Sequence, residues 1–514
     1  MARPATHCKT SWLVLVVGAA IVMATAAAPA ATRHETSAPP DVDEHLSEWV
    51  LPHHDYSNSR ATTDSTITAA NVGTLVEAWS KEMPGRGLFG NYASTPLIVG
   101  DTVYAQDLTS NVWALSLRDG SVTWSKEFNE PVIGPNGIGV GYGKAFAVIG
   151  RSQVVALDAD TGKKVWSRDV SLNAQDGVSI QPTPVGGLVL LSTFPGNIAE
   201  QDFPAGVRGV LQALDQRTGK VVWKFDTVKG KSLWGHDDVN AGGGAWYPPA
   251  VDLELGIAYW GTGNPAPWPG TAQFPGGTSR KGPNLYSDSV LAVGIRDGKL
   301  RWYQQPNPHD LFDHDLQLTM LVDDATGREL VVASGKLGIV FAYDARTGKP
   351  VWETPVGTHL NDDLKELPAA TPVSPGPLGG VITPMAHADG VIYVPVVENP
   401  ATYIPARPNF VSDFDLSGGT GVFVAINATT GAILWQHLLP TGMALGGATV
   451  VNDLVFTSTN DGTVYALNRA TGAEVWTYKA AGPINGWPAA VGDTILIPVG
   501  ASEPPALVAL RLGG

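Results

Sequence analysis

Two short stretches of the sequence hold residues that could bind a metal ion. Residues 261–268 read Gly-Thr-Gly-Asn-Pro-Ala-Pro-Trp and place the amide oxygen of Asn264 on a turn framed by glycine and proline. Residues 308–315 are acidic and include Asp313 and Asp315. Hard cations such as calcium prefer carboxylate and amide oxygens. In an extended segment, alternate side chains point the same way, and two adjacent carboxylates repel each other unless a cation or a proton lies between them.

The same residues also have a simpler interpretation. Asp, Asn and His side chains often hydrogen-bond to the backbone of solvated turns and have no further role. The spacing by itself therefore leaves two alternatives open, a cation site and a polar loop.

An eleven-residue repeat, Ala-x-Asp-x-x-Thr-Gly-x-x-x-Trp, predicts the framework that positions these stretches. Complete copies run from Ala156 to Trp166, Ala213 to Trp223, Ala342 to Trp352 and, with Asn in the Asp position, Ala466 to Trp476. Degenerate copies end at Trp124, Trp302 and Trp435, and Trp79 ends a similar apolar stretch without the turn. The two stretches described above lie outside these copies. Residues 261–268 fall in the long interval between Trp223 and Trp302, and residues 308–315 follow that interval.

Each repeat predicts two strands joined by a tight turn. An alternating strand runs into a turn where glycine takes the left-handed conformation, and the second strand carries the Trp. Such a unit cannot bury both of its faces alone, so neighbouring units stack with the Trp between them. Eight Trp positions, spaced as four-stranded units require, predict an all-β fold, an eight-bladed β-propeller with Trp docking. We expect the last blade to form by pairing of the two chain ends.

The chain begins with a segment that is typical of an export signal. Arg3 and Lys9 precede an apolar core over residues 12–28, and Ala28-Pro29-Ala30 offers a small-residue cleavage site. We therefore expect residues 1–31 to be a signal peptide, 32–48 a flexible leader and 49–514 the propeller. The location expected for the mature protein is periplasmic, secreted or within the cell envelope, with no membrane span after cleavage. A retained membrane anchor is the alternative.

The composition excludes several classes of function. A net charge of −15 argues against nucleic acid as a partner, because phosphates require a basic surface. Cys8 is the only cysteine and lies before the apolar core. The mature chain is therefore expected to have no disulfide, no thiolate metal site and no Cys-x-x-Cys-His haem attachment.

The Trp-ended repeats, the 261–268 motif and the acidic run together resemble the pyrroloquinoline-quinone (PQQ) dependent alcohol and sugar dehydrogenases. Residues 55–60 and 67–75 are similar to the opening segment of that family, so the resemblance covers nearly all of the mature chain. The repeat is only moderately specific, since non-catalytic propellers share it, whereas the motif around Asn264 is more specific. The resemblance implies bound PQQ and a calcium or lanthanide ion at the mouth of the channel.

The resemblance also implies roles for individual residues. Asn264, Asp313 and Asp315 match metal ligands, and Asp313 also matches the general base that removes the proton of the substrate hydroxyl. The residues that match contacts to PQQ are Lys336, Trp246 and Trp487. An ordinary solvated lysine at 336 and packing roles for the two Trp residues are the simpler alternatives.

The sequence departs from the family at two places. A glutamate that binds the metal in alcohol-oxidising members precedes Gly-Val-Arg-Gly, and here that position is Pro204, which cannot ligate. Glu200 or Asp202, a few residues upstream, could replace it. The vicinal disulfide that covers PQQ in methanol-oxidising members is also absent, which sugar-oxidising members tolerate.

Two functions therefore follow from the sequence. The first is a secreted quinoprotein oxidoreductase that oxidises an alcohol or sugar by hydride transfer to PQQ and passes electrons to a separate acceptor, a cytochrome or a quinone. The second is a non-catalytic propeller that serves as a cell-envelope scaffold or binding module, similar to outer-membrane assembly factors. The residues that distinguish them are Asn264, Asp313, Lys336 and Trp246, because a scaffold needs only the repeats.

Overall fold

A computed structural model describes residues 36–87, 89–90, 92–132, 134–196, 204–408, 418–500 and 505–513. The chain divides into two units, Met1–Glu35 and Thr36–Gly514, and the second is described here. The expected signal peptide at residues 1–31 lies outside the described residues. Within the described ranges, no helix is long and apolar enough to cross a membrane.

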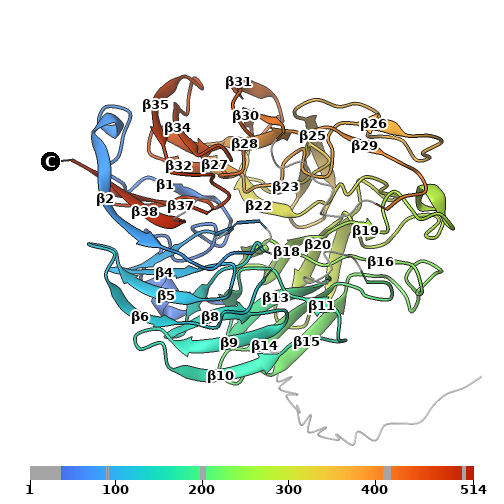
Figure 1. The fold of residues 1–514 in the computed structure, drawn as a ribbon, viewed down its shortest axis with the longest axis horizontal. Coiled ribbons are helices and arrows are strands. Elements are labelled where there is room, and N and C mark those ends of the chain that lie inside the picture. Colours follow the sequence, from blue (N-terminus) through green and yellow to red (C-terminus); the bar gives the residue numbers. More distant parts are fainter. Residues whose placement is uncertain are drawn as a thin grey trace, which may run out of the picture. The chain divides into compact units, whose positions relative to one another are not determined.

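Eight antiparallel sheets, each with a path of four strands, follow one another around a ring, as the predicted propeller requires (Figure 1). The first four blades, in chain order, are β3 (Leu97–Val99), β4 (Thr102–Gln106), β5 (Val112–Ser116) and β6 (Val122–Lys126); β7 (Gly139–Gly141), β8 (Lys144–Ile149), β9 (Gln153–Asp158) and β10 (Lys164–Asp169); β12 (Thr183–Val185), β13 (Leu188–Pro195), β14 (Val210–Asp215) and β15 (Val221–Asp226), with β11 (Asp176–Gly177) also on β13; and β17 (Ala250–Asp252), β18 (Ile257–Gly261), β20 (Val290–Gly294) and β21 (Leu300–Gln304).

The remaining four blades complete the ring. They are β22 (Leu318–Asp323), β23 (Glu329–Ser334), β24 (Ile339–Asp344) and β25 (Pro350–Pro355); β27 (Ala386–Ala388), β28 (Val391–Glu398), β30 (Thr420–Asn427) and β31 (Ile433–Leu439); β32 (Thr449–Val451), β33 (Leu454–Ser458), β34 (Thr463–Asn468) and β35 (Glu474–Lys479), with β1 (Ala61–Thr62) beside β32; and β36 (Ala489–Val491), β37 (Thr494–Val499), β38 (Ala506–Leu512) and β2 (Leu75–Glu82). The pairing of β2 with β38 confirms the expected closure by the two chain ends. The blue β2 and the red β38 lie side by side in Figure 1.

The repeated Trp residues dock each blade on the next one, as the sequence predicted. Seven indole Nε1 groups donate to a backbone carbonyl oxygen of the following blade at 2.7–3.1 Å: Trp79 to Leu117, Trp124 to Ala159, Trp166 to Gln216, Trp223 to Ile295, Trp302 to Ala345, Trp352 to Ala428 and Trp435 to Arg469. In blade 8 the third and fourth strands come from opposite ends of the chain, so no turn of the repeat lies beside Trp476.

The turn glycine of each repeat has two functions. Gly162 has a φ of +65°, which favours glycine, and a Cβ atom there would lie 2.6 Å from the indole of Trp124 in the preceding blade. The turn is closed by Asp158, whose carboxylate accepts hydrogen bonds from the backbone and the hydroxyl of Thr161. The Asp, Thr, Gly and Trp of the motif are therefore one docking unit shared between two blades.

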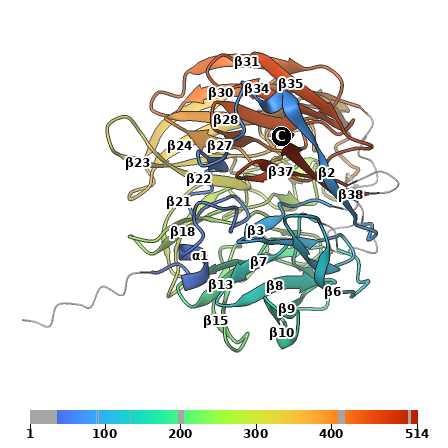
Figure 2. The same cartoon turned by 90° about the vertical axis from the view of Figure 1, so that its left-hand side faces the viewer.

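The segment from Thr36 to Thr62 is ordered against the ring, so the prediction of a flexible leader over 32–48 is wrong for its described part. The helix α1 (Pro40–Asp43) lies beside β7 (Figure 2), and the carboxylate of Asp41 accepts hydrogen bonds from the backbone of Tyr142 and Gly143. Val42 is buried. The segment is polar and contains prolines, but its polar groups find partners on the blades.

This N-terminal segment contacts all eight blades by hydrogen bonds. Its backbone oxygens accept hydrogen bonds from the backbone N–H groups of six blades: Ser37 from Gly186, Trp49 from Ile98, Tyr56 from Val251, Ser57 from Leu321, Ser59 from His387, and Arg60 and Thr62 from Val450 and Asn452. Asp41 binds blade 2, and the Arg60 guanidinium donates to the Pro488 oxygen at the start of blade 8. Because it touches every blade, the segment holds the ring together from within.

Arg60 is the centre of this arrangement. Its side chain is fully buried, and its guanidinium donates five hydrogen bonds: to the carbonyl oxygens of Ala448, Pro52 and Pro488 and to the hydroxyls of Thr95 and Thr449. All five acceptors are neutral, and burial lowers the pKa of Arg60 to about 9. A buried arginine with every donor satisfied fixes the segment in one position.

The long intervals between repeats form two additional ribbons. β16 (Ala241–Gly242) pairs with β19 (Pro265–Ala266), and β26 (Thr371–Val373) pairs with β29 (Ala401–Tyr403). Their apolar residues form a separate core with the acidic run: Ala241, Ala266, Trp268, Leu311, Phe312, Leu367, Val373 and Tyr403. Two insertions that are distant in the sequence therefore hold residues 308–315 between them.

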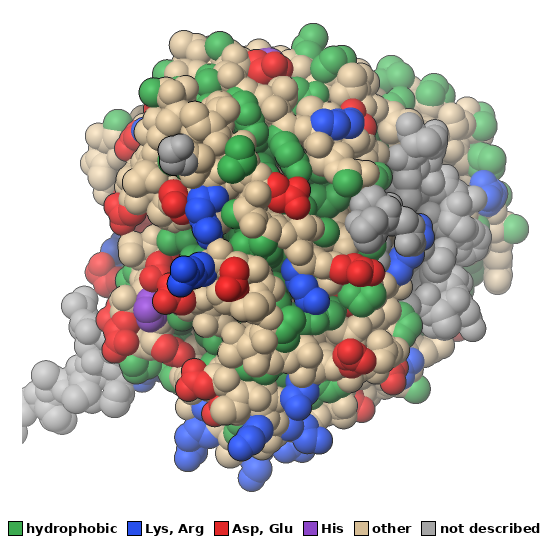
Figure 3. Space-filling model, turned by 60° about the vertical axis from the view of Figure 1, so that its left-hand side comes forward, with side chains coloured by type: hydrophobic (Ala, Val, Ile, Leu, Met, Phe, Trp, Pro, Cys, Tyr) green, Lys and Arg blue, Asp and Glu red, His purple; other side chains and the backbone are tan. Residues whose placement is uncertain are grey.

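Figure 3 shows one face of the molecule with its charged side chains. Acidic and basic side chains are interspersed over this face, and a group of basic side chains lies at its lower edge. The net charge of −15 is therefore not uniformly distributed over the visible surface.

Candidate active site

The acidic run contains one aspartate that stabilises the loop and two that face a lysine. The carboxylate of Asp310 accepts hydrogen bonds from the backbone of Phe312 and His314, each at 2.9 Å, so this residue has the turn-capping role. Tyr403 fixes the loop further by donating its hydroxyl to the Phe312 oxygen at 2.6 Å. With the turn fixed in this way, Asp313 adopts a φ of +64° instead of the expected extended conformation.

Lys336 connects the two remaining aspartates. Its Nζ lies 2.7 Å from Oδ2 of Asp313 and 2.7 Å from Oδ2 of Asp315. The side chain of Lys336 is only 12 % exposed, which excludes the alternative of an ordinary solvated lysine. Asp313 and Asp315 therefore face the same ammonium group, although the segment is not extended at Asp313 as expected.

A chain of backbone hydrogen bonds joins the motifs that form this site. Gly243 N donates to the Asn264 oxygen at 3.1 Å, and Gly263 N donates to the Gly244 oxygen at 2.9 Å. Asn264 N then donates to Oδ1 of Asp315 at 2.7 Å. The glycine run before Trp246, the Asn264 motif and the acidic run are thus neighbours in space.

The glycines in these motifs allow the backbones to approach. A Cβ at Gly335 would lie 1.7 Å from the Asp315 oxygen, and Lys336 N donates to that same oxygen at 2.9 Å. A Cβ at Gly244 would lie 2.8 Å from Cβ of Phe194. Larger residues at either position would separate Lys336 from Asp315 or displace Trp246.

Trp246 presents its ring to the same lysine. Lys336 Nζ lies 5.1 Å from the centre of the Trp246 ring, within the range of a cation–π contact. Phe194 lies nearly parallel to Trp246, with an interplanar angle of 20° and 6.4 Å between ring centres. Gln317 accepts a hydrogen bond from the backbone N–H of Trp246 at 3.3 Å, which ties the Trp to the segment after Asp315.

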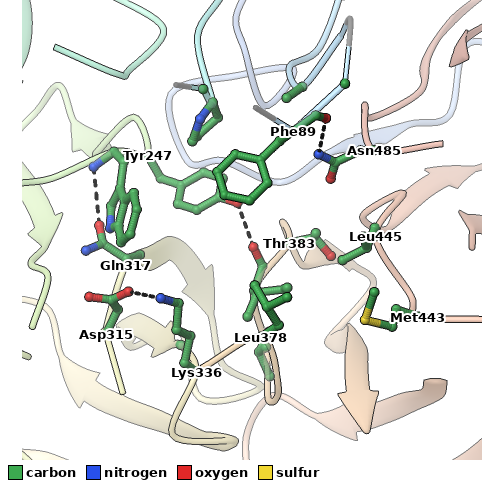
Figure 4. A pocket seen from close by; sticks show the side chains of 18 of the residues that line it. Phe89, Tyr247, Asp315, Gln317, Lys336, Leu378, Thr383, Met443, Leu445 and Asn485 are labelled. Atoms are coloured by element: carbon green, nitrogen blue, oxygen red, sulfur yellow. Dashed lines mark hydrogen bonds and ion pairs between the residues drawn. The ribbon is translucent and has the colours of Figure 1, made fainter. Parts of the chain in front are cut away.

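These residues border a cavity of about 400 Å³ (Figure 4). In the close view, Asp315 and Lys336 point toward each other on one side, and Leu378, Thr383, Met443 and Leu445 lie on the other. Trp487 is also in the wall, where its ring packs 5.3 Å from the ring of Tyr247. Trp246, Trp487, Asp313, Asp315 and Lys336 all line the cavity, whereas Asn264 lies behind it and contacts Asp315.

The N-terminal segment supports this wall from inside the ring. The His53 ring is buried and lies 6.2 Å from the Trp487 ring and 6.4 Å from the Tyr247 ring. Burial and the nearby Arg60 lower the pKa of His53 well below its ordinary value, so the ring is neutral at pH 7. The Tyr247 hydroxyl donates to the Ile382 oxygen at 2.6 Å, which attaches the same wall to the following insertion.

Burial and mutual repulsion determine the ionisation of the pair. Burial raises the pKa of Asp313 well above its ordinary range, Lys336 opposes this effect and Asp315 adds to it. Burial raises the pKa of Asp315 as well. The pKa of Lys336 is lowered by burial but raised more by the two carboxylates, so the lysine stays charged.

The donor atoms fit a cation next to Lys336. Oδ1 of Asp313 is buried and has no hydrogen-bond partner among the described residues. Asp315 shares Lys336 with it, and Asn264 reaches Asp315 through its backbone N–H, while its side-chain amide donates to the Pro265 oxygen. Within the described ranges, no set of three or more His, Cys, Asp or Glu side chains arranged for a metal is found. Glu200 and Asp202, the predicted replacements for the missing glutamate, lie outside those ranges, and Pro204 is described.

The cavity also fits a planar aromatic cofactor. The Trp246 ring offers a flat surface for stacking, Lys336 offers a cation at its edge, and Phe194, Trp268 and Ile484 make the surroundings apolar. A Gln317 Nε2 with no partner in the described part of the chain adds a free donor near Trp246. Apolar walls with a few convergent polar groups are typical of cofactor sites.

Three further polar residues near these motifs do not line the cavity. The half-buried His236 packs against Phe274, with ring centres 4.5 Å apart, and Asp237 accepts hydrogen bonds from Ser232 and from the Leu233 backbone. His309 Nδ1 lies 3.2 Å from the Gly282 oxygen. These side chains have the structural roles of turn residues.

Several site residues gave no signal in the sequence. Tyr247 and Gln317 line the cavity, and Arg280 and Asp288 are fully buried behind the Asn264 motif. Tyr247 adjoins the glycine run and Gln317 follows the acidic run by two positions, so proximity to those motifs was the only available indication. Arg280 and Asp288 lie in an irregular stretch that has no recognisable pattern.

Comparison with known families finds two that match different parts of the chain. Residues 176–359 match the family described as "Glucose/ethanol/alcohol dehydrogenase, beta-propeller domain". Residues 18–140 and 419–505 match the family described as "Outer membrane protein assembly factor BamB". The chain carries a PQQ-type β-propeller domain. The first of these matches contains the Asn264 motif, Asp313, Asp315 and Lys336, whereas the second covers blades away from them.

Individual relatives of this PQQ-type propeller are quinoprotein dehydrogenases. The chain is 26 % identical to the quinohemoprotein alcohol dehydrogenase ADH IIB of Pseudomonas putida, over 84 % of this chain and 70 % of the relative. It is also 26 % identical to a lanthanide-dependent methanol dehydrogenase of Methylacidiphilum fumariolicum, over 86 % of this chain and 82 % of that protein.

Solved structures share the fold. A europium-containing methanol dehydrogenase superposes with a TM-score of 0.76 at 22 % identity and covers 92 % of this chain and 99 % of its own. BamB from Moraxella catarrhalis gives a TM-score of 0.53 at 16 % identity, over 85 % and 97 % of the two chains.

Proposed function

We propose that this protein is a PQQ-dependent dehydrogenase that oxidises the hydroxyl group of an alcohol or a sugar. It uses a bound calcium or lanthanide ion and passes its electrons to a separate acceptor, a cytochrome or a quinone. The observation that carries the proposal is the position of Lys336 between Asp313 and Asp315 at the edge of a cavity faced by Trp246. A scaffold has no need for this buried charged group.

Each residue of the site has a different role in the reaction. When bound, PQQ and its cation supply the acceptor for the hydride that leaves the substrate carbon. Asp313 accepts the hydroxyl proton on Oδ1, since its Oδ2 is bound to Lys336. Asp315 is held by Asn264 N and Lys336, and so it fixes the distance between lysine and base.

The remaining residues orient the reactants and exclude water. Trp246 gives the cofactor a flat surface, and Lys336 provides a positive charge at its edge. Leu378, Met443 and Leu445 line the opposite wall. Apolar walls strengthen the charge interactions of Asp313 and Lys336, because the local dielectric is low.

The cation requires ligands beyond those in the described part of the chain. Asn264, Asp313 and Asp315 supply an amide and two carboxylates, and Pro204 cannot ligate. We assign the missing carboxylate to Glu200, with Asp202 as the alternative, since both precede Pro204 closely. Export by residues 1–31 would place the enzyme in the periplasm or outside the cell.

The decisive experiment is reconstitution of the mature protein with PQQ in the presence of calcium and, separately, of a light lanthanide. We expect PQQ to remain bound through gel filtration, as its absorbance would show, and a dye to be reduced with members of an alcohol and sugar panel. Loss of PQQ under every metal condition would contradict the proposal.

A scaffold role is the second candidate. It is favoured by Pro204 and by the match of residues 18–140 and 419–505 to the family of BamB. A scaffold would not retain PQQ and would instead be isolated with a cell-envelope partner, so the same gel filtration distinguishes the two functions.

A further inference from the structure

The wall of the cavity across from Lys336 is apolar (Figure 4). Leu378, Met443 and Leu445 lie there and line the cavity. Met443 is fully buried, Leu445 is buried and Leu378 is half-buried, so the three side chains are covered by the protein except where they border the cavity. When a substrate presents its hydroxyl group to Asp313, this wall is available to the rest of the substrate molecule.

Three polar side chains that also line the cavity direct their donors to the backbone. The Thr383 hydroxyl donates to the Ala444 oxygen, the Asn485 amide to the Phe89 oxygen and the Tyr247 hydroxyl to the Ile382 oxygen, at 2.6–3.1 Å. A sugar brings several hydroxyl groups into the site, and burial of a hydroxyl group without a hydrogen bond is costly. A simple alcohol brings only the hydroxyl group that reacts.

The turn that carries Leu378 is fixed against the lysine of the site. Val381 N donates to the Gly335 oxygen at 3.0 Å. A Cβ atom at Gly380 would lie 2.2 Å from the Lys336 oxygen, so the two backbones are in close contact. Backbone contacts therefore determine where Leu378 lies relative to Lys336.

Asn399 joins the two parts of the apolar wall. Its side-chain amide donates to Sδ of Met443 at 3.3 Å, and its carbonyl oxygen accepts from Gly376 N, in the turn of Leu378, at 2.9 Å. Leu445 N donates to the Met443 oxygen at 2.9 Å. The wall is thus formed before any ligand enters, and a preformed apolar surface loses little conformational freedom on binding.

We propose that the substrate is an alcohol with an apolar alkyl or aromatic body larger than that of methanol, and not a sugar, and that Leu378, Met443 and Leu445 determine this specificity. This inference rests on the proposed function, because it narrows the substrate of that site. The reacting hydroxyl group faces Asp313, and the body packs against the three side chains. Each methylene group that leaves water for this wall strengthens binding by about fourfold.

The first test is dye reduction by the mature protein loaded with PQQ, with methanol, propan-1-ol, pentan-1-ol, glycerol and glucose as substrates. We expect kcat/KM to rise by about fourfold for each methylene group added from methanol to pentan-1-ol. Glycerol and glucose should react at least about 100-fold less efficiently than pentan-1-ol, because their additional hydroxyl groups are buried without partners.

The variant Leu378→Asn tests the wall itself, since it places a polar amide in the wall at a half-buried position. We expect the ratio of kcat/KM for pentan-1-ol to that for methanol to fall by about tenfold, because the longer substrate depends more on the apolar contact. The matched control is Leu434→Asn, at an exposed position of β31 outside the cavity, and it should keep this ratio within twofold of the wild-type value. If Leu378→Asn fails to fold, Leu378→Ala provides the same comparison.

The second test needs neither PQQ nor turnover. Saturation-transfer NMR on the protein without PQQ measures contact of pentan-1-ol and of glucose with the cavity. We expect saturation of the pentan-1-ol methyl protons, a weaker signal with Leu378→Asn, an unchanged signal with Leu434→Asn, and none for glucose.

Three results would overturn the inference. The first is a kcat/KM for glucose equal to or above that for pentan-1-ol, and the second is an equal loss for methanol and pentan-1-ol in Leu378→Asn, which would give the wall only a structural role. Both leave the proposed function intact, because the enzyme still retains PQQ and turns over. The third is equal NMR saturation of glucose and pentan-1-ol, including none for either. Loss of PQQ under every metal condition would instead contradict the proposed function, and the NMR comparison would still decide whether the wall binds an apolar alcohol.

Discussion

Two places in this protein bring carboxyl groups close together, and the repulsion between those groups is relieved in a different way at each place. In the candidate active site, Asp313 and Asp315 share Lys336, whose Nζ is 2.7 Å from each. At the junction of blades 4 and 5, Asp252 at the end of β17 shares a hydrogen bond between carboxyl groups with Glu329 at the start of β23. The first pair is held by a cation and the second by a proton.

The difference lies in where the nearby cations are engaged. Arg328 and Arg346 line the same depression as Asp252 and Glu329, but Arg328 pairs with Asp324 at 2.8 Å and Arg346 lies 4.0 Å from Glu254. With no cation between the two carboxyls, burial and the charge of Asp252 raise the pKa of Glu329 to about 7. Two neighbouring carboxylates thus indicate a functional site only when a buried cation is directed at them.

The largest effect is expected when the ammonium group of Lys336, which lies between Asp313 and Asp315, is removed. Lys336→Met leaves Asp313 and Asp315 buried without their countercharge, and breaking such a pair typically costs about 3–5 kcal/mol of unfolding free energy. Denaturant unfolding in the presence of a chelator measures this loss. Lys349→Met, at an exposed turn lysine, is the control and should change stability little. A loss below about 1 kcal/mol for Lys336→Met would show that the lysine is not needed to hold the pair.

Removal of the charge of Asp313 should separate activity from stability. Asp313→Asn cannot accept the hydroxyl proton, and loss of a general base lowers kcat by about 10²–10⁴-fold. Its stability should not fall, because burial, together with repulsion from Asp315, disfavours the charge that the change removes by more than Lys336 favours it. Dye reduction by the reconstituted enzyme measures the rate, with Asp238→Asn as an exposed control. An unchanged kcat would exclude Asp313 as the base.

The second pair, Asp252 and Glu329, predicts that stability falls as pH rises. A salt-bridged carboxylate gives the opposite dependence. The folded state binds the Glu329 proton more tightly than the unfolded chain does, since the pKa rises from 4.5 to about 7. The free energy of unfolding therefore decreases as pH rises through this window. Glu329→Gln should remove this dependence and stabilise the protein at pH 8 by about 1–2 kcal/mol, after a discount for solvent screening, and have little effect at pH 4.

Thermal unfolding of Glu329→Gln and the wild type across that pH range is the measurement. The control is Glu353→Gln, a carboxylate of β25 that lies outside the pair. Equal stabilisation at pH 4 and pH 8 would contradict the shared proton.

The smallest effect is expected from Arg346. Its charge lowers the pKa of Glu329, against the larger effects of burial and Asp252. Arg346→Gln should shift the pH-dependent loss of stability to higher pH and change stability at pH 8 by about 0.3–1 kcal/mol, as for an exposed ion pair. A shift of the midpoint to lower pH in the same thermal scans would show that Arg346 does not act on Glu329.

The sequence alone determined the propeller and the identity of the motifs. The turn Asp, Thr and Gly act on one another within a few residues, and the Trp that follows always meets the next copy, so the spacing contains the information for eight blades. Asp313 and Asp315 are neighbours because they lie two positions apart, but the left-handed backbone of Asp313 was not predicted. Local geometry that recurs at a fixed spacing can be predicted from the sequence.

Only the tertiary structure decided which of these residues meet and which buried polar groups have no partner among the described residues. The order of residues 36–48 depends on partners such as Tyr142, about a hundred positions away. The proximity of Asn264, Asp315 and Lys336 depends on glycine-lined backbone contacts between separate blades. Asp288 has no signal in the sequence at all, because burial and the absence of a partner are properties of its surroundings and not of its neighbours along the chain.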